Sequence, residues 1–276
     1  MKKGKLKNIH KYAFSILLFC LSIIPFWILF VNATRSPEQI QQSFSMIPGD
    51  FLKQNYKILT DRGFSFFRGF ANSLFISMSA TFFVLYFSAM TAYSLVIYEY
   101  KGKKLLYGLI AFVLMIPAHL SLIGFYKLML KVGLTDSYIP LIIPGIAHPV
   151  TVFFLRQYLI SSFPKELVQA ARIDGASELT IFHKIALPLM KPGLATMAIF
   201  TFVATWNNLI KPLMLISTEN KYTLPMLVQL LKADIYQTEY GAIYLGITMT
   251  IIPLFLVYIV FSKYIIAGVA LGGIKE

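Results

Sequence analysis

Residues 164–193 read PKELVQAARIDGASELTIFHKIALPLMKPG, a water-compatible stretch set between two apolar runs. Pro164 suits the first turn of a helix, where its missing N–H would have no partner. Glu166 follows, where a negative charge suits the helix dipole. Gly175 then permits a sharp turn. The stretch therefore predicts two short helices, the second beginning near Ser177.

One face of the first predicted helix is small and nearly flat. Leu167, Ala170, Ala171 and Asp174 recur at three- and four-residue spacing, so we expect them to share this face. Such a hairpin either lies on the bilayer as an ordinary amphipathic helix or docks to a protein partner at the membrane surface. The Ala-Ala, Asp-Gly and Leu-Pro pairs favour docking, because a bare interfacial helix has no need of them.

Long apolar runs flank the hairpin on both sides. The chain of 276 residues is 57% hydrophobic and only 13% charged, with a mean hydropathy of +0.69, whereas a soluble domain carries about 25% charged residues. Each run approaches or exceeds the roughly 20 residues that span a bilayer, where helices satisfy their own backbone. The sequence predicts an all-α polytopic membrane protein with six transmembrane helices, at Tyr12–Thr34, Gly69–Tyr98, Leu105–Tyr126, Ser137–Leu155, Pro192–Ile210 and Tyr240–Ser262.

The first residues are basic and then apolar, as in a signal peptide, but the apolar run is long and no A-x-A-like site follows it. We interpret the run as a retained first helix. The predicted organisation is a cytoplasmic segment, residues 1–11, followed by one membrane domain, residues 12–276, in which the hairpin loop occupies residues 162–193. Cys20 lies inside the first run and has no second cysteine to pair with.

Lys and Arg residues set the orientation of the predicted helices. With the N-terminus in the cytoplasm, 15 of the 25 basic residues fall in inside segments, as the positive-inside rule requires. The C-terminus and the hairpin then lie in the cytoplasm too. The net charge of +13 sits at the ends of apolar runs and not around exposed aromatic residues, so a nucleic-acid partner is not expected.

The spacing of the hairpin resembles the coupling loop, or EAA loop, of ABC importer permeases. The family pattern is EAA, three residues, Gly, nine residues, Ile, one residue, Leu-Pro, and here it becomes Gln169-Ala170-Ala171, Gly175, Ile185 and Leu187-Pro188. In that family the hairpin docks in a groove of the ATPase subunit. The resemblance implies that the residues coupling the chain to an ATPase are Glu166, Gln169, Ala170, Ala171, Asp174, Gly175, Leu187 and Pro188.

Gln169 departs from the family pattern, which has Glu at this position. An amide can only form a neutral hydrogen bond, which is weaker than a charge-assisted one. Either the ATPase surface differs, or Glu166 and Asp174 supply the charge.

Further motifs resemble the carbohydrate subgroup of these permeases, and the tail resembles the maltose-type second permease. They are Asn72-Ser73, Ala92-Tyr93-Ser94-Leu95, Ile116-Pro117, Leu134-Thr135-Asp136-Ser137, Phe154-Leu155-Arg156-Gln157-Tyr158, Thr205-Trp206-Asn207-Asn208 with Pro212, and Lys263-Tyr264 with Gly268 and Gly272-Gly273-Ile274-Lys275.

Polar residues in the predicted fifth helix are candidates for the substrate pathway. Amides are costly in lipid, so Asn207 and Asn208 either line the pathway or hydrogen-bond to neighbouring helices. We interpret Trp206 as an anchor at the outer interface and as a third candidate for the pathway.

The resemblance implies a permease subunit of an ATP-driven ABC importer that moves a sugar or oligosaccharide by alternating access in the bacterial cytoplasmic membrane. The implied partners are a homologous first permease, two ATPase subunits and an extracytoplasmic solute-binding protein, which residues 35–68 or 211–239 would meet. No G-x-x-x-x-G-K-[ST] loop is present, so we expect no enzyme activity and no cofactor on this chain, with ATP and Mg²⁺ held by the partner ATPase.

Three alternatives compete with a sugar importer. An ABC permease for a peptide or polyamine would share the hairpin. A secondary transporter would place ionisable residues at mid-membrane, and the six predicted helices have none at their centres. A non-transporting membrane scaffold would have no use for a coupling hairpin.

Overall fold

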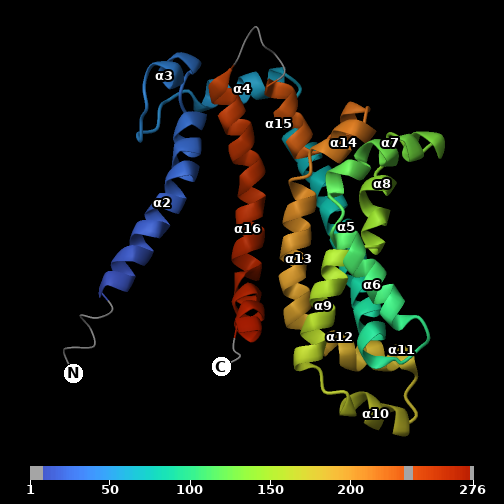
Figure 1. Ribbon diagram of the computed structural model, residues 1–276. Helices are drawn as coiled ribbons and strands as arrows, with labels where there is room; N and C mark the ends of the chain where they lie inside the picture. Colours follow the sequence, from blue (N-terminus) through green and yellow to red (C-terminus); the bar gives the residue numbers. More distant parts are fainter. Residues whose placement is uncertain (1–8, 233–238, 274–276) are drawn as a thin grey trace. The chain divides into compact units, whose positions relative to one another are not determined.

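The computed structural model describes residues 9–232 and 239–273, and every regular element in those ranges is a helix (Figure 1). The chain divides into two compact units, of which the first combines residues 1–67 with 226–253 and the second combines 68–225 with 254–276. Most of the predicted N-terminal segment, and the end of the tail motif from residue 274, lie outside the described ranges.

Four described helices are long and apolar enough to cross a membrane, namely Lys11–Ala33, Phe66–Ile97, Ile139–Ser162 and Tyr240–Ile259. A bent pair, Glu178–Leu189 with Lys191–Trp206, makes a fifth when it is counted as one span. The prediction of an all-helical membrane protein is confirmed. The first, second and sixth predicted stretches each coincide with one long helix.

The first unit contains α2 (Ile9–Ala33), α3 (Pro37–Gln42), α4 (Leu52–Asp61), most of α15 (Leu224–Lys232) and the first part of α16 (Tyr240–Gly273). Buried Asn55 joins α4 to the end of α2, since its Nδ2 donates to the carbonyl oxygens of Ala33 (2.9 Å) and Arg35 (3.0 Å). A Cβ at Gly241 would lie 2.4 Å from the Arg35 oxygen. Only glycine therefore allows α16 to approach the segment before α4 this closely.

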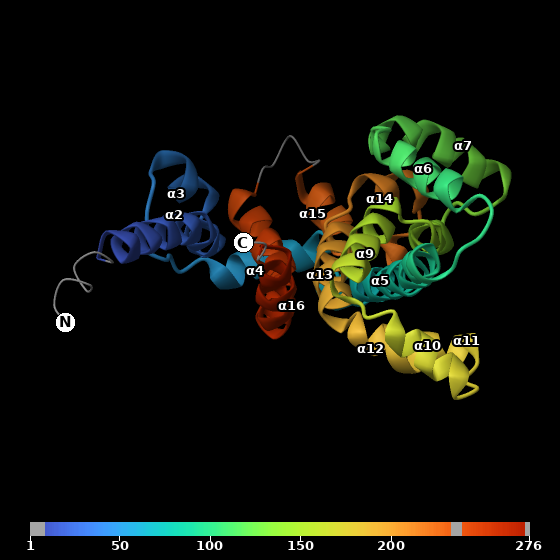
Figure 2. The same ribbon diagram turned by 60° about the horizontal axis from the view of Figure 1, so that its bottom comes forward.

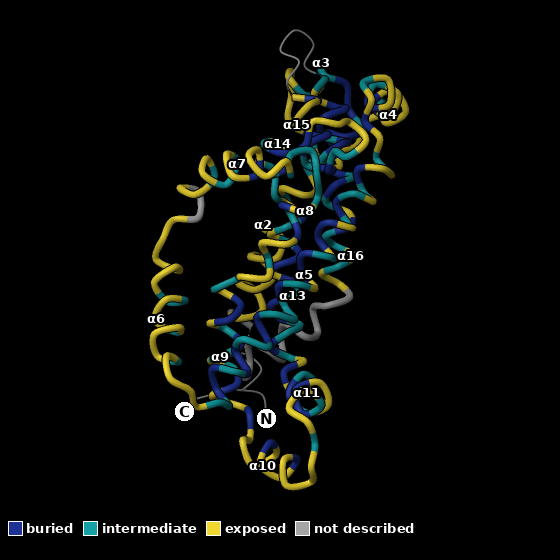
Figure 3. The backbone as a smooth tube through the Cα atoms, turned by 90° about the vertical axis from the view of Figure 1, so that its right-hand side faces the viewer, coloured by how far each residue is buried: buried dark blue, intermediate teal, exposed yellow. Residues whose placement is uncertain are grey.

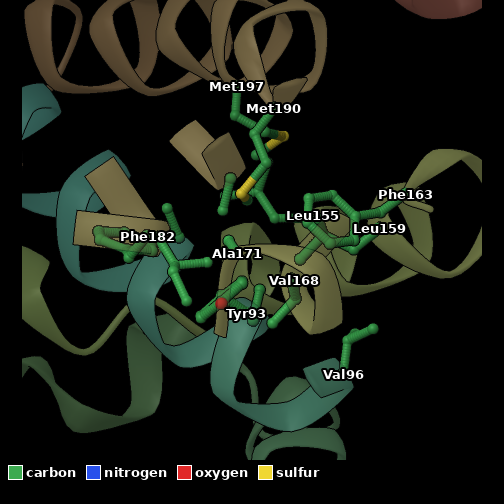
Figure 4. Packing of buried hydrophobic residues seen from close by; sticks show 14 residues of the cluster. Tyr93, Val96, Leu155, Leu159, Phe163, Val168, Ala171, Phe182, Met190 and Met197 are labelled. Carbon is green, nitrogen blue, oxygen red and sulfur yellow. The ribbon is translucent and has the colours of Figure 1, made fainter. Parts of the chain in front are cut away.

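The second unit is organised around α5 (Phe66–Ile97), which runs from one end of the unit to the other (Figures 1 and 2). Fourteen buried side chains from α5, α9, α13 and the hairpin form its main core (Figure 4). The other elements of the unit are α6 (Lys103–Leu114), η1 (Ala118–Ser121), α7 (Leu122–Lys131), α8 (Ile139–Ile142), η2 (Ile143–Ile146), α9 (Pro149–Ser162), α10 (Glu166–Ile173), α11 (Glu178–Ile181), η3 (Phe182–Ala186), α12 (Leu187–Leu189), α13 (Lys191–Trp206), α14 (Ile210–Leu215) and η4 (Glu219–Lys221).

The third predicted stretch, Leu105–Tyr126, is not one continuous helix. It divides into α6, the 3₁₀ turn η1 and α7, and the break falls beside Pro117. Proline lacks an N–H and its ring clashes with the preceding turn, so an unbroken helix is disfavoured here. The fourth stretch is also interrupted, at Pro144 and Pro149, although Ile139–Ser162 as a whole is long and apolar enough to span a membrane.

Candidate functional site

The hairpin begins with α10, which buries only a narrow face. Val168 (1% exposed) and Ala171 (9%) pack into the main core, as Figure 4 shows. Glu166, Gln169 and Ala170 are exposed on the other side of the helix, together with Asp174 beyond its end and Leu167. The expected face, which these four residues share within an arc of about 100°, is therefore divided between core and solvent, because α10 rests on the core through the second alanine and presents the first to solvent.

The turn of the hairpin closes α10 with two backbone hydrogen bonds. The N–H of Gly175 donates to Arg172 O (3.1 Å), and the N–H of Ala176 donates to Ala171 O (3.0 Å). This is the Schellman pattern, which requires a left-handed residue after the helix. Gly175 supplies it with φ of +78°, and no neighbouring atom lies within 4 Å of a Cβ built there. The glycine is thus required for its backbone conformation and not for space.

A salt bridge joins the two arms of the hairpin and ties them to α5. Arg172 donates to both carboxylate oxygens of Glu178, from Nε at 2.6 Å and from Nη2 at 3.2 Å. Glu178 also accepts a hydrogen bond from the Tyr98 hydroxyl (2.6 Å), one residue beyond the end of α5. Burial, together with this bond to Glu178, raises the pKa of Tyr98, so the phenol stays protonated as a donor at neutral pH.

A second contact joins α5 to the later part of the hairpin. The Nδ1 of His183 lies 2.8 Å from Leu179 O, an acceptor, so Nδ1 carries the proton. Nε2 then accepts from the Tyr86 hydroxyl at 3.1 Å. Deeper in the core, the rings of Tyr93 and Phe182 lie 5.5 Å apart. Two tyrosines of α5, Tyr86 and Tyr93, and Tyr98 directly after it therefore hold the hairpin.

The hairpin also exposes large apolar side chains. Ile173 is 86% exposed, Leu179 61% and Leu167 44%, and Figure 3 shows α10 as a mostly exposed element. An exposed apolar surface of this kind is typical of a site that contacts another protein or the membrane. Sequence reasoning did not single out Ile173 as a candidate. The feature that could have identified it is that Ile173 is an isolated apolar residue directly before the Asp174-Gly175 turn.

The second arm of the hairpin runs through the Leu187-Pro188 pair and ends at Leu189. Within it, the π-helix η3 ends where the N–H of Leu187 donates to Phe182 O, five residues back. Leu187 is half-buried against the core and Pro188 is exposed. The chain then bends by 76° into α13.

The predicted substrate-pathway residues lie at and beyond the end of α13. Trp206 is 2% exposed and packs against the rings of Phe70 (5.9 Å) and Phe202 (5.6 Å), so the interpretation as an exposed interfacial anchor is wrong. Asn207 caps the helix and is exposed, while half-buried Asn208 accepts a hydrogen bond from Lys211 N (3.3 Å). The two asparagines thus stand in the break before α14 and not within a helix.

At the other end of the second unit, Asp136 joins the segment before α8 to residues 217–221. Asp136 belongs to the Leu134-Thr135-Asp136-Ser137 motif, which resembles the carbohydrate subgroup of permeases. Its carboxylate accepts from Ser217 N (3.0 Å), Thr218 N (2.9 Å) and Lys221 Nζ (2.7 Å). The bond from Lys221, with those from Thr218 and Ser217, holds the pKa of Asp136 well below its usual range. Asp136 itself has φ of +55°, a conformation that aspartate tolerates better than most residues.

Side chains at the beginning of α5 form hydrogen bonds to residues 220–224, which overlap the segment that Asp136 holds. Asn72 Nδ2 donates to Asn220 O (3.0 Å) and Tyr222 O (2.9 Å), and Ser73 Oγ accepts from Leu224 N (2.9 Å). Side chains therefore bond α5 to the hairpin at one end and to residues 220–224 at the other. Within the described residues, no three His, Cys, Asp or Glu side chains group as metal ligands.

Comparisons with known proteins agree on one family. A family model described as "Binding-protein-dependent transport system inner membrane component" matches residues 87–270. The arabinooligosaccharides transport system permease protein AraQ of Halalkalibacterium halodurans is 37% identical, and the alignment covers 92% of each chain. The diacetylchitobiose uptake system permease protein NgcG of Streptomyces coelicolor is 31% identical over 95% of this chain and 87% of its own. A crystal structure of a bacterial ABC transporter involved in the import of alginate matches with a TM-score of 0.79 at 24% identity, covering 96% of this chain and 98% of the other, which shows the shared fold.

Proposed function

Because the chain belongs to the family of binding-protein-dependent transport system inner membrane components, we propose that it is a permease subunit of an ATP-driven importer of a sugar or oligosaccharide. The observation that carries the substrate class is the similarity, over 92% of each chain, to a permease named for arabinooligosaccharides. A second relative is named for diacetylchitobiose uptake. These names favour a sugar over a peptide or polyamine.

The proposed topology has six transmembrane passages with both termini in the cytoplasm. The third passage would consist of α6 and α7, broken beside Pro117, and the fifth would be α13. The hairpin then lies between the fourth and fifth passages on the cytoplasmic side. The distribution of Lys and Arg supports this orientation.

The proposed partners are a homologous first permease, two ATPase subunits and an extracytoplasmic solute-binding protein. The ATPase would dock on the exposed surface of α10, where the acidic side chains of Glu166 and Asp174 flank Ala170 and Gln169. The exposed Ile173 and Leu179 side chains would provide apolar contact beside them. ATP and Mg²⁺ belong to that partner, which performs the hydrolysis.

The proposed mechanism is alternating access. ATP binds one state of the ATPase dimer more tightly than the other and shifts the population of the whole complex toward that state. The hairpin moves with the ATPase, and the Tyr98–Glu178–Arg172 bonds and the Tyr86–His183 bond carry its movement to α5. The opposite end of α5 would carry the movement to residues 217–224 through Asn72 and Ser73.

The test is ATP hydrolysis by the purified four-chain complex in lipid, with its binding protein empty or loaded with arabinooligosaccharides, chitobiose derivatives, a peptide or a polyamine. We expect stimulation by one loaded oligosaccharide, with accumulation of that sugar inside proteoliposomes. Stimulation by a peptide or polyamine alone would contradict the sugar assignment and leave the importer assignment in place.

A further inference from the structure

A second candidate site lies at the turn between α5 and α6, beside the hairpin end of the second unit. A pocket of about 470 Å³ is bounded there by the end of α5, the first turns of α6 and the middle of α9. It is separate from the exposed surface of α10, and the proposed transport function makes no use of it.

The pocket carries an excess of positive charge. Its lining includes the cations Lys103, Lys104 and Arg156 and one carboxylate, Glu99. Lys103 Nζ already bonds to Glu99 Oε1 at 2.8 Å and to Tyr98 O at 2.8 Å. Lys104 and Arg156 therefore remain as charges that no carboxylate of the pocket balances.

Arg156 is held in place, and one of its hydrogen-bond donors, Nε, has no acceptor among the described residues. Its guanidinium carbon lies 3.9 Å from the centre of the Tyr107 ring, a cation–π contact that fixes the side chain against the pocket wall. Its Nε is buried and, within the described part of the chain, has no hydrogen-bond partner. A buried donor of this kind is expected to have an acceptor, and an anion at the pocket would satisfy the guanidinium.

The first turn of α6 adds further donors. Gly102 is the N-cap residue, with φ of +88°, and it has no side chain to cap the helix. The N–H of Lys103, the first residue of this 12-residue helix, donates to Tyr100 O (3.3 Å). The backbone N–H groups of Lys104 and Leu105, which follow in the first turn, have no acceptor within the helix and favour a bound anion.

Apolar side chains continue from the pocket along α6. Leu105 is 69% exposed and Leu109 is 53% exposed, and both lie in an apolar stretch that we assign to the membrane. Tyr100 and Tyr107, which line the pocket, have the amphipathic rings typical of the membrane interface. The cationic pocket and the adjoining exposed leucines of α6 together fit a ligand with a negative head and apolar tails better than they fit a free ion.

We propose that the pocket binds the phosphate group of an anionic phospholipid headgroup, with the acyl chains lying along α6. Lys104, Arg156 and the first turn of α6 hold the phosphate, and Lys103 orients the turn through Tyr98 and Glu99. A soluble phosphate would share this chemistry but would make no use of the leucines.

The test uses the complete importer complex in nanodiscs of phosphatidylcholine mixed with phosphatidylglycerol. The lipids retained after detergent extraction are counted by native mass spectrometry. Lys104→Gln is compared with Lys101→Gln, which removes the same charge from an exposed residue that does not line the pocket. We expect the retained ratio of phosphatidylglycerol to phosphatidylcholine to fall about fivefold in Lys104→Gln and to stay at the wild-type value in Lys101→Gln.

Arg156→Gln and Arg156→Lys provide a second pair, since only lysine keeps the charge. Retention should be lower in the glutamine variant than in the lysine variant, in protein that elutes as an intact complex. Equal ratios in wild type, Lys104→Gln and Arg156→Gln would overturn the proposal. Binding of inorganic phosphate in pure phosphatidylcholine nanodiscs, lost in Arg156→Gln without any preference for phosphatidylglycerol, would overturn the lipid assignment. Sugar transport is a separate readout, so a wrong substrate class would leave the lipid result unaffected.

Discussion

At the scale of single residues, two adjacent alanines in α10 have opposite surroundings. Ala170 is exposed, whereas Ala171 is 9% exposed and packs with Val168 in the core. A Cβ on a helix moves through about 100° per residue, so neighbours lie on different sides. The same substitution at the two positions should therefore separate docking from folding.

Ala170→Glu should leave the permease folded and membrane-inserted but should lower ATP hydrolysis and uptake by at least about tenfold, because a bulky charge blocks close approach of the ATPase. Ala171→Glu should lower the amount of folded permease itself, since a buried unpaired charge costs several kcal/mol. Size-exclusion chromatography measures assembly of the complex, and fluorescence of a tagged permease measures the yield of folded protein. Together they distinguish a docking defect from a folding defect. Ala170→Ser is the control. Normal uptake by Ala170→Glu would contradict the docking surface.

Tyr98→Phe removes one hydrogen bond between α5 and the hairpin without changing the exposed surface of α10. A partly exposed hydrogen bond contributes about 0.6 kcal/mol, so the sugar transported per ATP hydrolysed should fall about threefold while the ATPase stays bound. Tyr56→Phe, at an exposed position of α4, is the matched control. Equal coupling ratios in the two variants would show that this bond does not transmit movement.

At the scale of elements, the turn between α10 and α11 depends on one backbone conformation. Gly175 adopts φ of +78° and has open space around it, so a substitution is opposed by the backbone alone. Gly175→Ala should destabilise the hairpin by about 1 kcal/mol, and Gly175→Asn by less, because asparagine tolerates this region. Hydrogen exchange of the Ala176 amide measures this opening directly. Faster exchange in the asparagine variant than in the alanine variant would contradict the conformational explanation.

The carboxylate of Asp136 fastens the segment that precedes α8 to residues 217–221, and its pKa is lowered in the folded protein. A lowered carboxyl pKa contributes stability at a pH above the unfolded value of about 3.9, and that contribution is lost as the pH falls below it. Between pH 6 and pH 3.5 the Tm of wild type should therefore fall more than that of Asp136→Asn. Asp61→Asn, at the exposed last residue of α4, should follow the wild-type profile.

At the scale of the whole molecule, the sequence predicted the helical class, the first, second and sixth long helices and the two arms of the hairpin. These features depend on local apolar runs, on Pro164 and on Gly175, which are visible within a few residues. The sequence did not predict the break in the third stretch. The run is apolar throughout, and membrane helices tolerate proline, so Pro117 alone does not distinguish a kink from a break. It also misplaced Trp206, since an apolar side chain near a helix end suits both an interface and a core.

The contacts that position the hairpin were the least predictable part of the site. Tyr98 and Glu178 are 80 residues apart, and Asn72 and Tyr222 are 150 apart. No local period relates such pairs, so only the folded chain brings them together. The face of α10 was ambiguous for a different reason, because two small residues side by side fit either the core or the surface.

The same long separations have a consequence for biosynthesis. When α5 leaves the ribosome, neither the hairpin that its tyrosines will hold nor the residues that Asn72 and Ser73 will bind have been made. At a synthesis rate of about 5–20 residues per second, the 150 residues up to Tyr222 take roughly 8–30 s. During that interval the polar groups of Asn72 and Ser73 need temporary partners, such as water or a membrane insertase. A nascent chain arrested before Ser217 should accordingly be degraded faster than one that extends past Leu224.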